Sequence, residues 1–241
     1  MLLIGVIASG PRGHTWKCSG AHVANLRARP WLSWRAHTGL LSFSGDESPE
    51  AKAMAMTAVL LELKLTLADI KPPVWRRLLV PNQITLGRLH QYIQAVADWK
   101  DYHLHEFVIA EKRYGRPAPR EVVPVHNEAL VRLNTLPLAE GTSFTYMYDF
   151  GDHWEIEVKV ERILPRDPEA PYPLVLAGGR AFPPDDSGGA SGYEIFLEAL
   201  SDPANPEHEG YRRWIGEGFD PERFDPEETN HRLRLLISTL A

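Results

Sequence analysis

Residues 144–161, FTYMYDFGDHWEIEVKVE, contain two runs of alternating apolar and polar residues joined by a short polar segment. Successive side chains of a β-strand point to opposite faces of a sheet, so this alternation predicts two half-buried strands joined as a β-hairpin. A lone hairpin is only marginally stable in water, so the rest of the chain is expected to pack against its apolar face. The residues predicted to line that face are Phe144, Tyr146, Tyr148, Trp154, Ile156, Val158 and Val160.

The part of the chain before this hairpin becomes regular at Val59, where leucines alternate with polar residues as far as Leu67 and predict a strand. Pro72 and Pro73 end the pattern, because proline lacks a backbone donor and pushes the preceding residue into an extended conformation. The elements expected next are a strand over 74–80, a helix over 85–98 capped by Thr85, a strand over 103–110, a turn and loop at 114–117, and a short helix over 127–133.

The C-terminal part of the chain is predicted to be helical after an irregular segment. Residues 165–192 are rich in proline and glycine, which favours a loop. Three helix start signals follow: a capping box formed by Ser191 and Glu194, Asn205 before Pro206, and Asp225 before Pro226. Strands first and helices last predict an α+β fold: a mostly antiparallel sheet, one helix inserted between the early strands, and a C-terminal group of helices.

The first 55 residues differ from the rest of the chain. They show neither helical nor strand periodicity, and they carry six Lys or Arg against three Asp or Glu. Residues 1–56 are therefore predicted to be a poorly ordered extension. Because Met54 and Met56 stand just before the first strand, we also hypothesise that this extension is an artefact of the assigned gene start. Residues 57–241 are predicted to be a single domain.

Composition restricts the classes of function. The one cysteine, Cys18, excludes an intrachain disulfide and a zinc site built from cysteines, and it favours a reducing, cytoplasmic setting. No apolar run approaches the roughly 20 residues of a membrane-spanning helix, so no membrane association is expected. Residues 56–241 carry 20 basic against 29 acidic side chains. This excess disfavours non-specific binding to nucleic acid, which depends on neutralising phosphates.

Six motifs occur in the order found in a known family: IKPPVWRRLLVP, TLGRLHQYIQAVADW, HLHEF, YMYDFGDHWEIEV, FPPDDSGGASGYEIFLEAL and FDPEETNHRL. From about Val59 to Leu236 the chain resembles the plasmid pRiA4b ORF-3-like family, whose members include passenger proteins of mobile elements. The resemblance implies an α+β fold and a mobile-element association, but no biochemical mechanism. Members often carry cysteine at the position of Phe182 or near Ser187, and tryptophan near Ser191, so any role of those cysteines is not shared by this chain.

A candidate site is centred on His103 and His105, which lie two positions apart on a predicted strand and are expected to project from the same face. With Asp149, Asp152 or His153 from the hairpin turn, they would supply three or four ligands for a divalent metal, with His103, His105 and Asp149 as the first choice. The alternative is structural: the histidines hold the sheet together and the two aspartates shape a tight turn. The sequence leaves both interpretations open, and no cofactor is firmly indicated.

A second candidate surface combines aromatic and basic residues: Trp75, Arg76 and Arg77, with Arg88 nearby in sequence. Such a surface suits single-stranded nucleic acid, because bases stack on aromatic rings while guanidinium groups contact phosphates. The alternative is a strand whose tryptophan belongs to the core and whose arginines pair with the many acidic side chains.

The sequence contains no complete catalytic set. No serine lies in a Gly-x-Ser-x-Gly elbow, and no Walker phosphate-binding pattern is present. We therefore expect a cytoplasmic binding or interaction protein without catalysis, acting through an unidentified protein or nucleic-acid partner. The two alternatives are a metal-dependent hydrolase that uses the His/Asp cluster and a nucleic-acid-binding protein.

Overall fold

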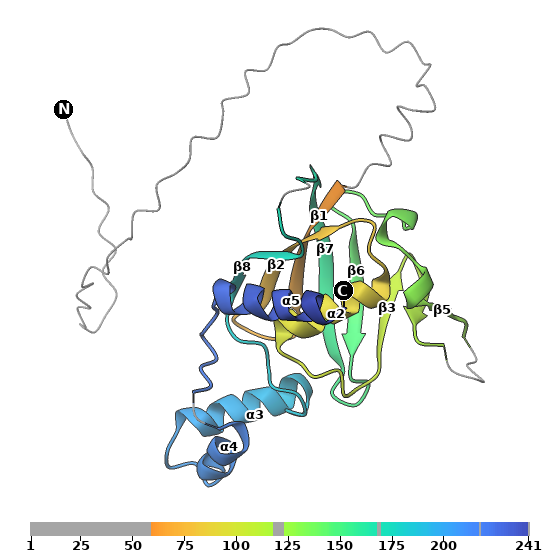
Figure 1. Ribbon diagram of the computed structural model, residues 1–241. Coiled ribbons are helices and arrows are strands. Elements are labelled where there is room, and N and C mark those ends of the chain that lie inside the picture. The colour runs from red at the N-terminus through yellow and green to blue at the C-terminus, as the bar shows by residue number, and fades with distance from the viewer. Residues whose placement is uncertain (1–58, 118–122, 168–169, 217, 241) are drawn as a thin grey trace, which may run out of the picture. The chain divides into compact units, whose positions relative to one another are not determined.

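The computed structural model describes residues 59–117, 123–167, 170–216 and 218–240 (Figure 1). The predicted N-terminal extension, residues 1–56, lies outside these ranges. The described residues contain an eight-stranded sheet in the order β5-β4-β3-β6-β7-β1-β2-β8. All neighbouring strands are antiparallel except β4 and β5, which run parallel. The predicted α+β fold with a mostly antiparallel sheet is therefore confirmed.

One helix precedes most of the sheet and three helices follow it, as predicted. The strands are β1 (Val59–Leu67), β2 (Trp75–Pro81), β3 (His105–Ile109), β4 (Lys112–Gly115), β5 (Val125–Asn127), β6 (Ser143–Tyr148), β7 (Trp154–Pro165) and β8 (Leu174–Gly179). The helices are α2 (Leu86–Ala97), α3 (Gly189–Ser201), α4 (His208–Ile215) and α5 (Pro226–Leu240), with two short 3₁₀ helices, η1 (Glu128–Leu130) and η2 (Leu133–Thr135). In these residues no helix combines the length and the apolar character needed to cross a bilayer.

The hairpin of β6 and β7 lies near the middle of the sheet. Its strands pair so that Tyr146 lies opposite Ile156 and Tyr148 opposite Trp154. All seven apolar residues predicted for its inner face are buried. Strand β1 pairs with the other side of β7, and its alternating leucines are buried as well. The period-2 pattern thus identified both the strands and the face that forms the core.

Helix α2 packs its apolar face on the sheet. Thr85 has an extended backbone, and its hydroxyl oxygen accepts a hydrogen bond from the N–H of Arg88 at 3.2 Å, so the predicted N-cap is confirmed. Leu86, Leu89 and Ile93 are completely buried. Helix α5 lies beside α2 and against β8, so the two helices cover the same face of the sheet (Figure 1).

The edge of the sheet differs from the prediction. Strand β3 begins at His105 rather than at residue 103, and β4 extends into the loop predicted at 114–117. β4 has only four residues, which is too short for an alternating pattern to be recognised. The helix predicted over 127–133 is replaced by η1 and η2, because the backbone returns to an extended conformation at Val131 after the single turn that Asn127 caps.

Strand β8 lies inside the stretch that was predicted to be a loop. Gly178 and Gly179, which suggested a loop, are paired in this strand with Arg76 and Trp75 of β2. A Cβ atom on these glycines would lie 2.8 Å from the Arg76 side chain and 2.7 Å from the Trp75 ring. The glycines are therefore needed for close packing in a strand, a reason that composition does not reveal.

The three C-terminal helices are present, but two of them start at other residues than predicted. Helix α3 begins at Gly189, so Ser191 is inside the helix and is not its cap. The Asn205 side chain accepts a hydrogen bond from the N–H of Glu207 at 2.9 Å and forms a turn, after which α4 begins at His208. The two helices pack on each other through aromatic residues: Phe196 of α3 contacts Tyr211 and Trp214 of α4, and Tyr193 lies beside Phe196 on α3.

Candidate functional site

Two histidines lie stacked between helix α2 and strand β3. His90 comes from the buried face of α2, and His105 is the first residue of β3. Their rings are nearly parallel, with 4° between the planes and 3.4 Å between the centroids. Both residues are buried, at 1% and 6% exposure. Buried imidazole nitrogens need partners, because an unpaired buried polar atom is unfavourable.

Two carboxylates supply these partners. Asp101 Oδ1 lies 3.0 Å from His90 Nε2, and Glu128 Oε2 lies 2.8 Å from His105 Nε2. Asp101 stands in the loop after α2 with a φ of 56°. Glu128 is buried at the start of η1. We refer to His90, Asp101, His105 and Glu128 as the paired-histidine site.

Two further side chains fix the positions of His90 and Asp101. The Tyr146 hydroxyl on β6 lies 2.9 Å from His90 Nδ1 and accepts a hydrogen bond from the Gln94 amide at 3.0 Å. The Gln94 side-chain oxygen accepts a hydrogen bond from the N–H of Asp101 at 2.9 Å. Because Tyr146 occupies Nδ1, the Nε2 atom of His90 is the nitrogen directed at the carboxylate.

The electrostatics of the paired-histidine site favour a cation. Burial, and secondarily the neighbouring His105, lowers the pKa of His90 to about 4, so this imidazole is neutral at neutral pH. Arg116 Nη2 lies 3.0 Å from Asp101 Oδ2, and Arg116 Nε lies 3.8 Å from Glu128 Oε1. One guanidinium group, itself 60% exposed, therefore faces two carboxylates.

The donor atoms suit a divalent transition metal. One ligand atom from each of His90, Asp101 and His105 lies within 4.8 Å of the others, and Glu128 adds a second carboxylate beside His105. Imidazole nitrogen and carboxylate oxygen are typical zinc ligands, at bond lengths of about 2.0–2.2 Å. To bind one ion the two rings must splay apart, because a metal lies near the plane of each imidazole that holds it.

His103 belongs to a second cluster, which lies on loops. His103 Nδ1 is 3.5 Å from Asp149 Oδ2, and His103 Nε2 is 3.0 Å from Asp186 Oδ1. One ligand atom of each of these three residues lies within 4.8 Å of the others. Burial is the main cause that raises the pKa of the adjacent Asp185, whose carboxylate accepts a hydrogen bond from the N–H of Lys100 at 2.9 Å.

The structure thus divides the predicted metal site between two clusters. His103 and His105 do not project from one strand face, because His103 lies in the loop before β3. Asp149 stays with His103, and His105 instead meets His90. The structure therefore does not bring His103, His105 and Asp149 together around one position, and the predicted ligand set is corrected.

The remaining candidates shape the hairpin turn. Asp149 Oδ1 accepts a hydrogen bond from the N–H of Gly151 at 2.8 Å, as the turn interpretation predicts. Asp152 Oδ2 accepts one from the N–H of Gly188 at 2.9 Å and ties the turn to the start of α3. His153 is exposed and has a φ of 58°.

The basic and aromatic candidates on β2 do not form one surface. Arg76 and Arg77 are neighbours on a strand, so their side chains point to opposite faces. Arg76 is buried at 3% exposure, whereas Arg77 pairs with Glu161 at 2.5 Å. Trp75 is partly buried and lies under Arg77, 5.5 Å from its guanidinium carbon. Arg88 lies elsewhere, on α2.

Comparison with known proteins places the chain in a family. The sequence profile of the plasmid pRiA4b ORF-3-like proteins matches residues 59–228. The chain belongs to this family. It is 38% identical over 162 residues to the uncharacterized protein y4hQ of Sinorhizobium fredii. The aligned region covers 67% of this chain and 83% of y4hQ. A crystal structure of a protein of unknown function, MM3350 of Methanosarcina mazei Go1, matches with 42% identity and a TM-score of 0.66, over 71% of this chain and 97% of MM3350.

Position 182, where the family resemblance leads us to expect cysteine in related proteins, is part of the core here. Phe182 is buried, and its ring lies 5.5 Å from Trp99 in an edge-to-face contact. The Arg76 guanidinium carbon lies 4.9 Å from the centroid of the same phenyl ring. At this position the chain thus contributes an apolar ring rather than a thiol.

Three residues of the paired-histidine site were not expected from the sequence. His90, Asp101 and Glu128 are separated from each other by 11 or more positions and match no ligand spacing. One signal was present: His90 directly follows Leu89 on the apolar face of the predicted helix. A polar residue at a position that must be buried requires a partner, which could have identified His90 but not the acids that meet it.

Proposed function

We propose that this pRiA4b ORF-3-like protein binds one divalent transition-metal ion at the paired-histidine site, and that Zn²⁺ fits its ligands. The observation that carries the proposal is the meeting of two stacked, buried imidazoles with two carboxylates. Imidazole nitrogens and carboxylate oxygens, four donors in all, are the usual ligand types of a protein zinc site. The contact of Tyr146 with His90 Nδ1 is of the kind that orients metal-binding histidines in proteins.

The competing explanation is a hydrogen-bonded network that joins α2, β3 and η1 without an ion. Both explanations use the same contacts, but they differ in what happens when metal is added. Metal binding releases any protons held on the ligands and stabilises the folded state in proportion to the logarithm of the free metal concentration. A network without an ion gives no saturable response.

The test is calorimetric titration of the metal-free, full-length protein with Zn²⁺, together with elemental analysis of protein purified without chelator. We expect one ion per chain, and at least tenfold weaker binding for Asp101→Asn and His105→Gln. The control is His153→Gln, which removes an exposed histidine outside the site. Equal zinc affinity in Asp101→Asn and the wild type would refute the proposal, provided that circular dichroism shows both proteins folded.

Metal-dependent hydrolysis is a second candidate function, favoured by a small pocket beside the site. The pocket has a volume of about 80 Å³ and is lined by His105, Arg116, Leu104 and Phe150. A bound zinc ion lowers the pKa of a coordinated water to about 7 and so supplies a nucleophile. Zinc-dependent turnover of p-nitrophenyl esters or phosphates that is lost in Asp101→Asn would support this function, and metal binding without turnover would leave a binding protein. Action through a partner protein or nucleic acid stays a prediction.

A further inference from the structure

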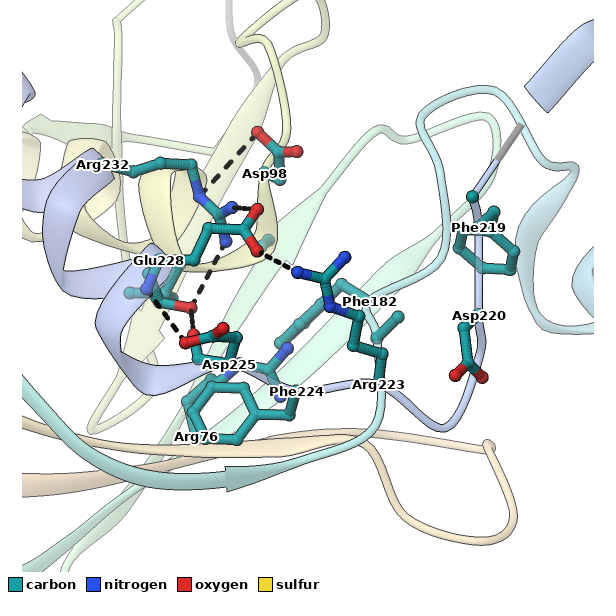
Figure 2. A pocket seen from close by; sticks show the side chains of 15 residues that line it. Arg76, Asp98, Phe182, Phe219, Asp220, Arg223, Phe224, Asp225, Glu228 and Arg232 are labelled. Atoms are coloured by element: carbon teal, nitrogen blue, oxygen red, sulfur yellow. Dashed lines mark hydrogen bonds and ion pairs between the residues drawn. The ribbon is translucent and has the colours of Figure 1, made fainter. Parts of the chain in front are cut away.

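A pocket of about 220 Å³ lies between β2, α2 and the segment that leads into α5 (Figure 2). It shares no residue with the paired-histidine site, and the inference drawn from it is independent of the proposed metal. Three kinds of side chain line its walls: guanidinium groups, phenyl rings and carboxylates. They belong to Arg76, Arg223 and Arg232, to Phe182, Phe219 and Phe224, and to Asp98, Asp220, Asp225 and Glu228.

Arg76 is buried without an acidic partner among the residues that the structure describes. Its Nη1 donates hydrogen bonds to two backbone carbonyl oxygens, of Trp75 at 2.7 Å and of Gly179 at 3.1 Å. Its Nε has no hydrogen-bond partner. The guanidinium carbon lies 4.9 Å from the Phe182 ring centroid and 4.3 Å from that of Phe224. These cation–π contacts are favourable, but a buried charge still needs an opposite charge.

The acidic side chains near Arg76 do not supply this opposite charge. Glu228 is divided between two other arginines, at 2.9 Å from Arg223 and 3.0 Å from Arg232 (Figure 2). Asp225 accepts hydrogen bonds from the first N–H groups of α5. Burial, and secondarily the charge of Arg232, lowers the pKa of Arg76 to about 9. An anion placed beside Arg76 would relieve both effects.

We propose that this pocket binds a small organic carboxylate with an apolar or aromatic body. A carboxylate matches the planar fork of a guanidinium group, and the phenyl walls of the pocket match an apolar body. Asp98, Asp220 and Asp225 also line the pocket and disfavour an anion of higher charge such as phosphate. A cavity of about 150 Å³ can hold benzene, so this pocket has room for a ring and its carboxylate.

The test is titration of the isotope-labelled, full-length protein with benzoate, followed by heteronuclear NMR. We expect saturable shifts of amides around the pocket, including those of Phe182 and Phe224. Benzamide, which has the same shape without the charge, and inorganic phosphate should bind much more weakly. Arg76→Lys should weaken benzoate binding at least tenfold, because the ammonium group keeps the charge but loses the fork.

A change at buried Arg76 can also impair folding. A second variant therefore changes a side chain at the rim of the pocket. Glu228→Gln removes a half-exposed carboxylate, so we expect benzoate to bind about threefold to tenfold more tightly. Glu227→Gln is the matched control, since it removes the same charge from the neighbouring residue of α5 outside the pocket. The proposal is overturned if benzoate causes no saturable shifts, if benzamide or phosphate binds as tightly, or if Glu228→Gln and Glu227→Gln behave alike.

Discussion

Charged residues of three neighbouring strands pair across the sheet. Arg77 on β2 lies 2.5 Å from Glu161 on β7 and 3.4 Å from Glu62 on β1. Glu62 also pairs with Arg162 of β7. Glu62 is 3% exposed, so its carboxylate depends on these two arginines for compensation. Arg76, the neighbour of Arg77, points to the helix-covered face, and this explains why adjacent arginines have such different surroundings.

The Arg77–Glu161 pair makes stability depend on pH. The hydrogen bond from Arg77 lowers the pKa of Glu161 below its ordinary 4.5. A carboxyl group with a lowered folded-state pKa stabilises the protein above its ordinary pKa, and this contribution is lost as pH falls through the lowered value. We expect Glu161→Gln to reduce the free energy of unfolding by about 0.5–1 kcal/mol at pH 7.

Urea denaturation at several pH values measures this effect. The difference between Glu161→Gln and the wild type should shrink as the pH falls below 4.5. Glu155→Gln, a change on the outward side of the same strand, serves as the control. A difference that stays constant down to low pH would show that packing rather than charge is responsible.

At the scale of elements, the start of α3 is fixed against the hairpin turn. Gly188 and Gly189 both have positive φ angles, 84° and 67°. A Cβ atom on Gly189 would lie 2.4 Å from the backbone oxygen of Asp152. The junction therefore needs glycine for conformation and for space, and it connects helix α3 to the loop that carries Asp149.

This junction gives a prediction about Gly189→Ala. Strain from positive φ costs about 1–2 kcal/mol, and the overlap with Asp152 adds about 1–3 kcal/mol. The matched control is Gly141→Ala, since Gly141 has a φ of 86° with nothing within 4 Å of the added Cβ. Thermal denaturation should therefore show a clearly larger loss for Gly189→Ala. Equal losses would mean that the turn moves away without cost.

At the scale of the whole described region, the sheet with α2 and α5 is distinct from the α3–α4 pair. The central strands β1, β6 and β7 are flanked on both sides and contribute a set of completely buried residues: Leu63, Leu65, Tyr146, Tyr148, Ile156, Val158 and Val160. The α3–α4 pair is smaller: its fully buried rings are Tyr193 and Phe196, both on α3, and Trp214 of α4 is 46% exposed. A part of a fold with fewer buried contacts opens at lower free energy.

We therefore expect hydrogen exchange to separate the two parts. Amides of α3 and α4 should exchange through local opening, at a free energy below that of global unfolding, while those of β1 and β7 should exchange only on global unfolding. Native-state exchange at increasing denaturant, read by mass spectrometry, distinguishes them. Identical exchange free energies in α4 and β1 would show a single cooperative unit instead.

The elements that could be predicted are those whose pattern is local. Alternation in β1, β6 and β7 places each strand and its inner face, because a strand has two faces and one of them must be buried. Thr85 marks the start of α2 in the same way, since its hydroxyl satisfies an N–H of the helix it precedes. β8 was not predicted because the reason for its glycines is not local. They leave space for the side chains of Arg76 and Trp75, which lie about a hundred positions earlier in the chain.

The candidate sites likewise combine features that are local in the sequence with contacts that depend on the tertiary structure. The residues HLH and DFGDHW could be recognised in the sequence as polar groups that need partners, yet which partner each receives is not a local property. His105 contacts His90 and Glu128, whereas His103 contacts Asp149 and Asp186, because β3 begins at His105 and leaves His103 in the preceding loop. Periodicity was enough to specify strands, the main helix and the buried face. The two clusters and the arginine pocket exist because packing the sheet brings distant polar residues into a space where burial forces them to pair.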